Sequence, residues 1–142
     1  MYTQGTSRGQ ALVIVILLSA MLMAAGGIFI KIVLAEKNTV DLYIQKEKCL
    51  YLAEAGLEEG KAIIAANPNW FTDMPHGQAD DIDWLINDAA GSTKQFGGGR
   101  YKMVRETGKS MIYSVGYFKK GIAIVRTKYA PIPFKAYEFK VL

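Results

Sequence analysis

The most constraining feature of the sequence is an uncharged, apolar run of twenty residues, Ala11 to Ile30. Arg8 precedes this run and Lys31 follows it. A helix of this length spans about 30 Å, which is the thickness of the hydrocarbon core of a bilayer. No other run in the sequence approaches this length, so we expect one membrane helix, residues 10–30, near the N-terminus.

The next segment, Lys31 to Ala66, continues the helical pattern without a proline. Its apolar positions recur every seven residues and predict one buried stripe. The stripe comprises Leu42/Tyr43, Cys49/Leu50, Gly56/Leu57 and Ile63/Ile64, with Ala53 and Gly60 between them, and the opposite face carries Glu47, Lys48, Glu54, Glu58 and Glu59. Asn67-Pro68 predicts the end of the helix. An unbroken helix over residues 10–66 is about 85 Å long, too long for a small domain to cover.

Residues 67–99 are rich in Asn, Asp and Gly and predict a connecting region. Within it, residues 81–89 suggest a short helix with Asp80 as its N-cap. We expect the Gly91 to Lys94 stretch and Gly97 to Gly99 to be loop, because neither has the frame of a phosphate-binding loop.

From residue 100 to 142 the apolar period changes to two, which predicts strands. Four strand-like runs are separated by short turns, which favours an antiparallel meander. The runs are Arg100–Glu106, Ser110–Phe118, Ile122–Ala130 and Phe134–Val141, and the turns are 107–109, 119–121 and 131–133.

A four-stranded sheet of this size needs cover on one face, and the stripe on the long helix is the available apolar surface. The residues expected to pack helix on sheet are Leu50, Ala53, Gly56, Leu57, Gly60 and Ile64. The predicted fold is therefore α+β and lollipop-like, with a membrane helix half (10–30), an amphipathic helix half (31–66), a connecting loop (67–99) and an antiparallel sheet (100–142).

Charge divides the sequence into two opposite halves. Residues 10–90 contain five Lys and Arg against eleven Asp and Glu, whereas residues 91–142 contain eleven against two. Basic and tyrosine side chains in the second half suggest a surface that binds DNA or another anion. Alternatively, the basic side chains protect the edge of the sheet and attract the acidic helix faces of neighbouring subunits. The basic candidates are Arg100, Lys102, Lys119, Lys120, Arg126 and Lys128, with Lys109 nearby, and the tyrosines are Tyr101, Tyr113, Tyr117 and Tyr129.

The sequence offers little for catalysis or metal binding. Cys49 is the single cysteine and His76 the single histidine, so neither a zinc site nor a His-based triad can be assembled. Asp80, Asp81, Asp83 and Asp88 suggest either calcium ligands or a capped, solvated loop, and their spacing does not match an EF-hand. The helix glutamates have no neighbouring nucleophile, so we expect no enzyme, no cofactor and no metal.

The N-terminal residues resemble the type IV pilin and pseudopilin superfamily. The resemblance rests on Arg8-Gly9 directly before the apolar run, on the long helix, and on the C-terminal sheet. The segment YLAEAGLEEG, Tyr51 to Gly60, is similar to the AEAGLE stretch of PilX-type minor pilins. The similarity covers residues 8 to 66, and over the sheet it is one of architecture only.

This resemblance implies a processing pathway and a set of partners. Residues 1–9 would be a leader that a prepilin peptidase cuts between Gly9 and Gln10 on the cytoplasmic side, followed by N-terminal methylation. The head would be extracytoplasmic, and the helix would lie in membrane lipid until an inner-membrane assembly platform extracts it into a filament of other pilins or pseudopilins. The filament would be periplasmic or extracellular.

The sequence departs from the family at two positions. Family members usually have a glutamate at the fifth residue after the cut, where this chain has Ile14, and Gln10 stands where aromatic or methionine residues are commoner. In the family that glutamate neutralises the amino terminus of a neighbouring subunit. Its absence resembles minor subunits at the filament tip, which also initiate assembly.

Three alternatives remain open from the sequence. The apolar run suits a plain signal anchor, or a secretory signal cleaved after Val33-Leu34-Ala35. The second functional class is a membrane-anchored extracytoplasmic module whose basic sheet captures DNA or an anionic surface.

Overall fold

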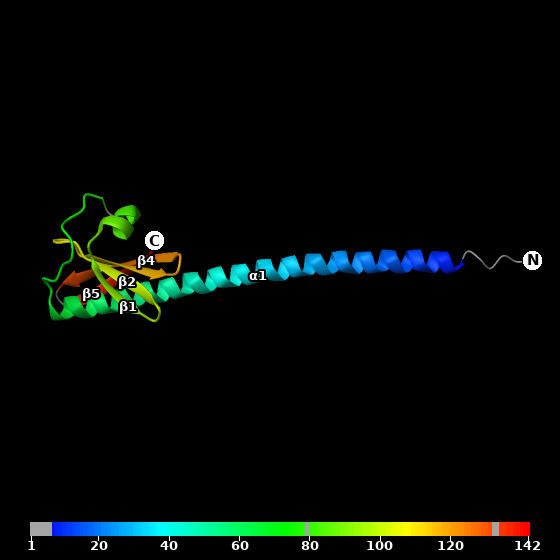
Figure 1. The fold of residues 1–142 in the computed structure, drawn as a ribbon. Helices are drawn as coiled ribbons and strands as arrows, with labels where there is room; N and C mark the ends of the chain where they lie inside the picture. Colours follow the sequence, from blue (N-terminus) through cyan, green and yellow to red (C-terminus); the bar gives the residue numbers. More distant parts are fainter. Residues whose placement is uncertain (1–6, 79, 132–133) are drawn as a thin grey trace, which may run out of the picture. The chain divides into compact units, whose positions relative to one another are not determined.

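The computed structural model describes residues 7–78, 80–131 and 134–142. The chain divides into two compact units, Met1–Asp41 and Leu42–Leu142, which are described separately. The elements are α1 (Ser7–Ala66), η1 (Trp84–Asp88), β1 (Ser92–Phe96), β2 (Gly99–Val104), β3 (Met111–Phe118), β4 (Gly121–Pro131) and β5 (Phe134–Val141) (Figure 1). Helix α1 ends where Asn67-Pro68 predicted, and the Asn67 N–H donates to the Ile63 carbonyl at 2.7 Å.

The predicted α+β fold is confirmed: one long helix accompanies an antiparallel sheet, on which its second part packs. The sheet has the order β1-β2-β3-β4-β5, and every neighbouring pair is antiparallel. All four predicted strands are present within a few residues of their expected bounds. Of the turn expected at 131–133, residues 132 and 133 lie outside the described residues.

The prediction that Ser92 to Lys94 form a loop is wrong. These residues belong to β1, a fifth strand that pairs with β2 through a turn at Gly97 and Gly98. Gly99, also expected in a loop, is the first residue of β2. Both glycines have positive φ, at 56° and 78°, which L side chains rarely adopt. The sequence of β1 is polar and four of its five residues are exposed, because it lies at the edge of the sheet. It therefore shows no apolar period.

One face of the sheet packs on the second part of α1. Ala53, Leu57 and Ile64 of α1 are buried against Ile112 and Val125. Two small residues of the helix allow the close approach: a Cβ added to Gly56 would lie 2.4 Å from Ser114 Oγ, and one added to Gly60 would lie 2.1 Å from Ile112 Cδ1. Leu50 is partly buried beside this cluster.

The buried stripe begins later along α1 than the sevenfold period predicted. Leu42 and Tyr43 are 67% and 66% exposed, whereas Cys49 is fully buried. Gly121, at the start of β4, already lies beside Gln45 and Cys49, so the sheet gives little cover before this level of the helix.

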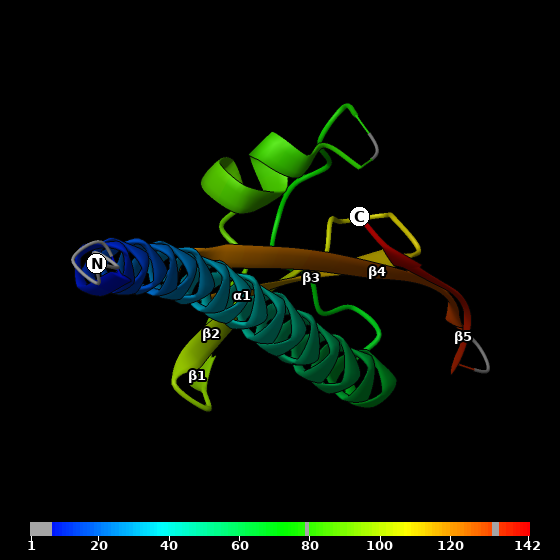
Figure 2. The same cartoon turned by 90° about the vertical axis from the view of Figure 1, so that its right-hand side faces the viewer.

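The opposite face of the sheet is also covered, which the sequence analysis did not anticipate. Leu85 and Ala89, within and after η1, are buried against Val104, Tyr113 and Val115. Figure 2 shows η1 and the second part of α1 on opposite faces of the sheet. The connecting region therefore forms a second covering layer.

Asp81, and not Asp80, caps the short helical segment. The Trp84 N–H donates to Asp81 Oδ1 at 3.0 Å, whereas Asp80 has a positive φ of 60° and pairs with Arg126 at 2.5 Å. The segment is helical over 82–88, and the Ala89 N–H donates to the Trp84 carbonyl at 2.8 Å. Aspartate tolerates the left-handed region better than most residues, which lets Asp80 turn its carboxylate toward the sheet.

Candidate functional site

The first unit presents an apolar helical surface. From residue 9 to 41 every side chain of α1 is exposed within the unit. Helix α1 is also the one described helix long and apolar enough to cross a membrane, judged by length and composition. Large apolar side chains exposed in this way are costly in water, so this surface requires lipid or protein cover.

The residues expected at the processing site lie at the beginning of α1. Gly9 and Gln10 are helical and exposed, and a Cβ added to Gly9 would meet nothing within 4 Å. No packing in the described residues therefore demands a glycine at this position. Leader residues 1–6 and the Arg8 side chain lie outside what the structure describes.

At the position where the family has a glutamate, this chain has the exposed apolar side chain of Ile14. Ile14 is 56% exposed on α1. The sequence contains no Asp or Glu between Gln10 and Lys31, so this surface offers no carboxylate to a positive charge.

The basic side chains of the sheet do not gather into one exposed surface. Lys102 is only 7% exposed, and its Nζ donates to the carbonyls of Ile86 at 3.1 Å and Ala89 at 3.0 Å. Burial lowers the pKa of Lys102. Arg126 forms its ion pair with Asp80. Both side chains hold the connecting region on the sheet and are not directed at solvent.

The tyrosines expected to stack on bases are also largely inaccessible. Tyr101, Tyr113 and Tyr129 are 8%, 2% and 1% exposed. Burial raises the pKa of Tyr113 and of Tyr129. Only Tyr117 of the four is partly exposed, so the described sheet lacks a row of accessible aromatic rings from this set.

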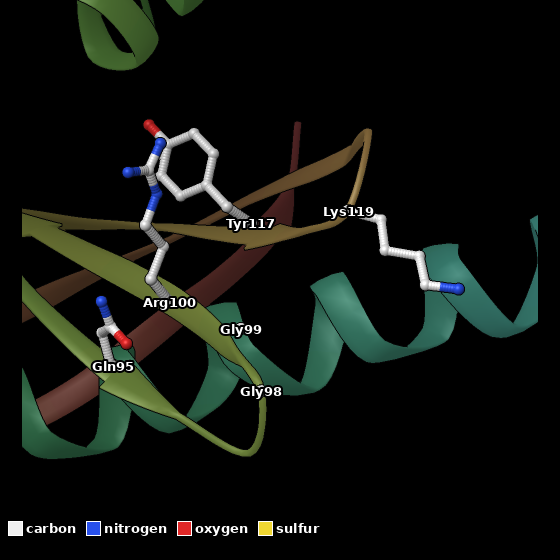
Figure 3. Close-up of a pocket in the computed structure, with 6 residues that line it drawn as sticks. All are labelled: Gln95, Gly98, Gly99, Arg100, Tyr117 and Lys119. Carbon is white, nitrogen blue, oxygen red and sulfur yellow. The ribbon is translucent and has the colours of Figure 1, made fainter.

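Arg100 and Lys119 line one open cavity of about 260 Å³ together with Gln95 and Gly98. The guanidinium of Arg100 lies 4.8 Å from the centre of the Tyr117 ring. Lys119 Nζ lies 5.9 Å from the Phe118 ring, and Figure 3 shows its side chain pointing away from Arg100. The two charges therefore diverge. Of the other two candidates, Lys120 is exposed and Lys128 is half-buried.

Glu59 contacts the sheet. From the sequence it was expected on the solvated face of the helix, opposite the buried stripe. Lys94 Nζ and the Tyr101 hydroxyl both donate to its carboxylate. The hydrogen bond from Lys94 is the main cause that lowers the pKa of Glu59, and the bond to Glu59 raises the pKa of Tyr101 to about 12. This contact joins α1 to the β1–β2 hairpin.

His76 belongs to a polar cluster in the connecting region that the sequence did not indicate. Its ring stacks on Trp84 with centres 4.6 Å apart, and its Nε2 lies 3.0 Å from Asp81 Oδ2. The Trp84 N–H bond, with the contact from His76, lowers the pKa of Asp81. In the described ranges no three His, Cys, Asp or Glu side chains converge as metal ligands, and Asp80 and Asp81 have separate partners.

Comparisons with protein families, with curated proteins and with solved structures find no match to this chain. A functional conclusion therefore depends on the geometry and on the sequence resemblance.

Proposed function

We propose that this chain is a minor subunit of a type IV pilin-like or pseudopilin-like filament, with a structural and not an enzymatic role. One observation carries the proposal. The same helix, α1, has an exposed apolar surface over residues 11–30 and, from Cys49 onward, a buried face that packs on the sheet. A plain membrane anchor does not require a helix that continues into the core of the head.

The proposed pathway rests on the resemblance to the pilin superfamily, and the apolar surface of this helix is consistent with it. The chain is inserted with its N-terminus cytoplasmic and its head extracytoplasmic, and membrane lipid covers the apolar surface. Prepilin peptidase cuts between Gly9 and Gln10, and the new amino terminus is methylated. An assembly platform then transfers the helix from lipid to the apolar helices of other pilins, so the surface exchanges one apolar environment for another.

Mass spectrometry of the mature N-terminus tests the proposal. A chain beginning at a methylated Gln10 supports it, and Gly9→Leu should abolish the cut without changing the head, since no described side chain packs against Gly9. A mature chain beginning at Glu36 identifies a secretory signal, and an uncut chain identifies a plain anchor; either result refutes the proposal.

A further inference from the structure

A cavity of about 370 Å³ lies where the loop after α1 faces the β2–β3 turn. Pro68 to Phe71 form one wall, and Arg105 to Gly108 form the other. Its lining combines two aromatic rings, an amide, a hydroxyl, a guanidinium and the Glu106 carboxylate. This cavity shares no lining residue with the cavity beside Arg100.

Arg105 supplies a positive charge to this cavity. Its Nη1 donates to the carbonyls of Pro68, at 2.8 Å, and Trp70. Its guanidinium lies 5.2 Å from the centre of the Tyr129 ring, and its Nε is buried on the protein side without an acceptor among the described residues. In the same ranges no carboxylate lies within 4.0 Å of the guanidinium, so its charge is not neutralised by an ion pair. The neighbouring Glu106 carboxylate is 2% exposed and pairs with Lys109 at 2.7 Å, so its charge is offset. The guanidinium charge therefore favours an anionic ligand group.

The backbone donors around the cavity are largely occupied. The N–H groups of Asn69, Trp70 and Thr72 donate to Asn67 Oδ1, the Asn67 carbonyl and the Arg105 carbonyl, respectively. The Thr107 N–H donates to the Asp73 carbonyl. Few backbone N–H groups are therefore left to bind the terminal carboxylate of a peptide ligand. A ligand in this cavity would be recognised by side chains.

Three exposed side chains complete the lining. The Phe71 ring is 50% exposed, Asn69 presents an amide, and the Thr107 hydroxyl donates to the Asp73 carbonyl at 3.3 Å, which leaves its oxygen free to accept. An apolar ring face beside a few polar groups is suited to a ligand with one apolar face and several hydroxyls.

We propose that this cavity binds an acidic sugar, a uronic acid unit of a polysaccharide. The sugar carboxylate pairs with Arg105, the carbon face of the ring stacks on Phe71, and the hydroxyls bond to Asn69 and Thr107. This assignment does not depend on the proposed filament role.

The test uses the full chain in phosphatidylcholine nanodiscs and ligand-observed NMR titration. The probe is a galacturonic acid trimer, and the matched ligand is its methyl ester, which keeps the sugar rings and removes the charges. We expect saturable binding of the acid. The dissociation constant of the ester should be at least about tenfold higher than that of the acid. Phe71→Ala and Asn69→Ala should each weaken binding of the acid without changing the thermal melt, because both side chains are exposed.

Arg100→Gln is the control, since Arg100 is an exposed arginine on β2 that lines a different cavity. It should leave binding unchanged, whereas Arg105→Lys should weaken it by retaining the charge without the planar geometry. Equal binding of acid and ester, unchanged binding in Phe71→Ala, or equal binding of a glutamate trimer overturns the proposal. So does the absence of saturable binding.

Discussion

Gly116 of β3 lies directly against the backbone of Cys49 in α1: a Cβ added to Gly116 would stand 2.1 Å from the Cys49 carbonyl oxygen and 2.6 Å from the Ala53 nitrogen. Helix and sheet are therefore in contact through their backbones at this point. A backbone group moves only with its whole element, so the contact fixes the distance between α1 and β3.

Gly116→Ala should destabilise the head by about 1–3 kcal/mol or more, because the added methyl group must displace α1 from the sheet. Gly60→Ala should cost less, since its closest neighbour is the end of the flexible Ile112 side chain at 2.1 Å. Thermal melting of both variants shows which substitution costs more stability. Gly77→Ala is the control, because a Cβ added there meets nothing within 4 Å. A smaller effect at Gly116 than at Gly60 would contradict the rigid backbone contact.

Leu57→Asp should unfold the head. Leu57 is 1% exposed in the cluster between α1 and the sheet, and a carboxylate placed there would be buried among hydrophobic side chains. A soluble fragment beginning at about Lys37 is expected to fold, and its circular dichroism melt gives the measurement. Tyr51→Asp provides the control, because Tyr51 is 62% exposed on the same helix and its substitution should change the melting temperature little. A Leu57→Asp fragment that melts like the unmodified one would exclude the observed packing.

The contact between Glu59 and Tyr101 predicts stability losses at both ends of the pH range. The pKa of Tyr101 is raised to about 12, so its contribution is complete below pH 10 and is lost as the pH rises through 12. The pKa of Glu59 is lowered, so its contribution to stability is complete above pH 4.5 and is lost as the pH falls through the lowered pKa.

Urea unfolding of the head across this pH range measures both losses. Glu59→Gln should reduce the acid-side loss and shift the absorbance titration of Tyr101 toward lower pH, because it removes the charge that opposes phenolate formation. An unchanged tyrosine titration in Glu59→Gln would show that the charge of the Glu59 carboxylate does not raise the pKa of Tyr101.

Apolar patterning predicted α1 and the four longer strands. The uncharged apolar run indicated the first part of the helix, the sevenfold period its second part, and the period of two the strands. The polar strand β1 escaped detection, since its edge position buries almost none of its side chains. Asp80 was expected to cap the short helix, but it pairs with Arg126, which is 46 residues away in the sequence. Asp81 is the cap instead. Glu59 and Lys102 acquire their partners through contacts with segments distant in the sequence, so local pattern contains no sign of them. His76 meets Asp81 and Trp84 through the conformation of the connecting region.

The last prediction concerns Ile14 and the number of copies in a filament. In the proposed assembly, the mature amino terminus is a positive charge in an apolar environment, where an unpaired ion is costly and a neighbouring carboxylate offsets it. This chain has no carboxylate between Gln10 and Lys31. A filament of this subunit alone would bury one uncompensated charge per copy, so self-assembly should fail. A copy at the tip would be tolerated in this assembly, because its amino terminus could pair with a glutamate-bearing subunit below it.

We therefore expect few copies per filament and a requirement for other pilins, measured by quantitative immunodetection in sheared filaments. Ile14→Glu supplies the missing carboxylate and should increase the number of copies incorporated. It should leave the melting of the head unchanged, because Ile14 is 56% exposed and lies in the first unit. Ile14→Gln is the matched control: it is polar but carries no charge, so it should not increase incorporation. If the unmodified chain were the predominant subunit, both the tip assignment and the charge argument would be refuted.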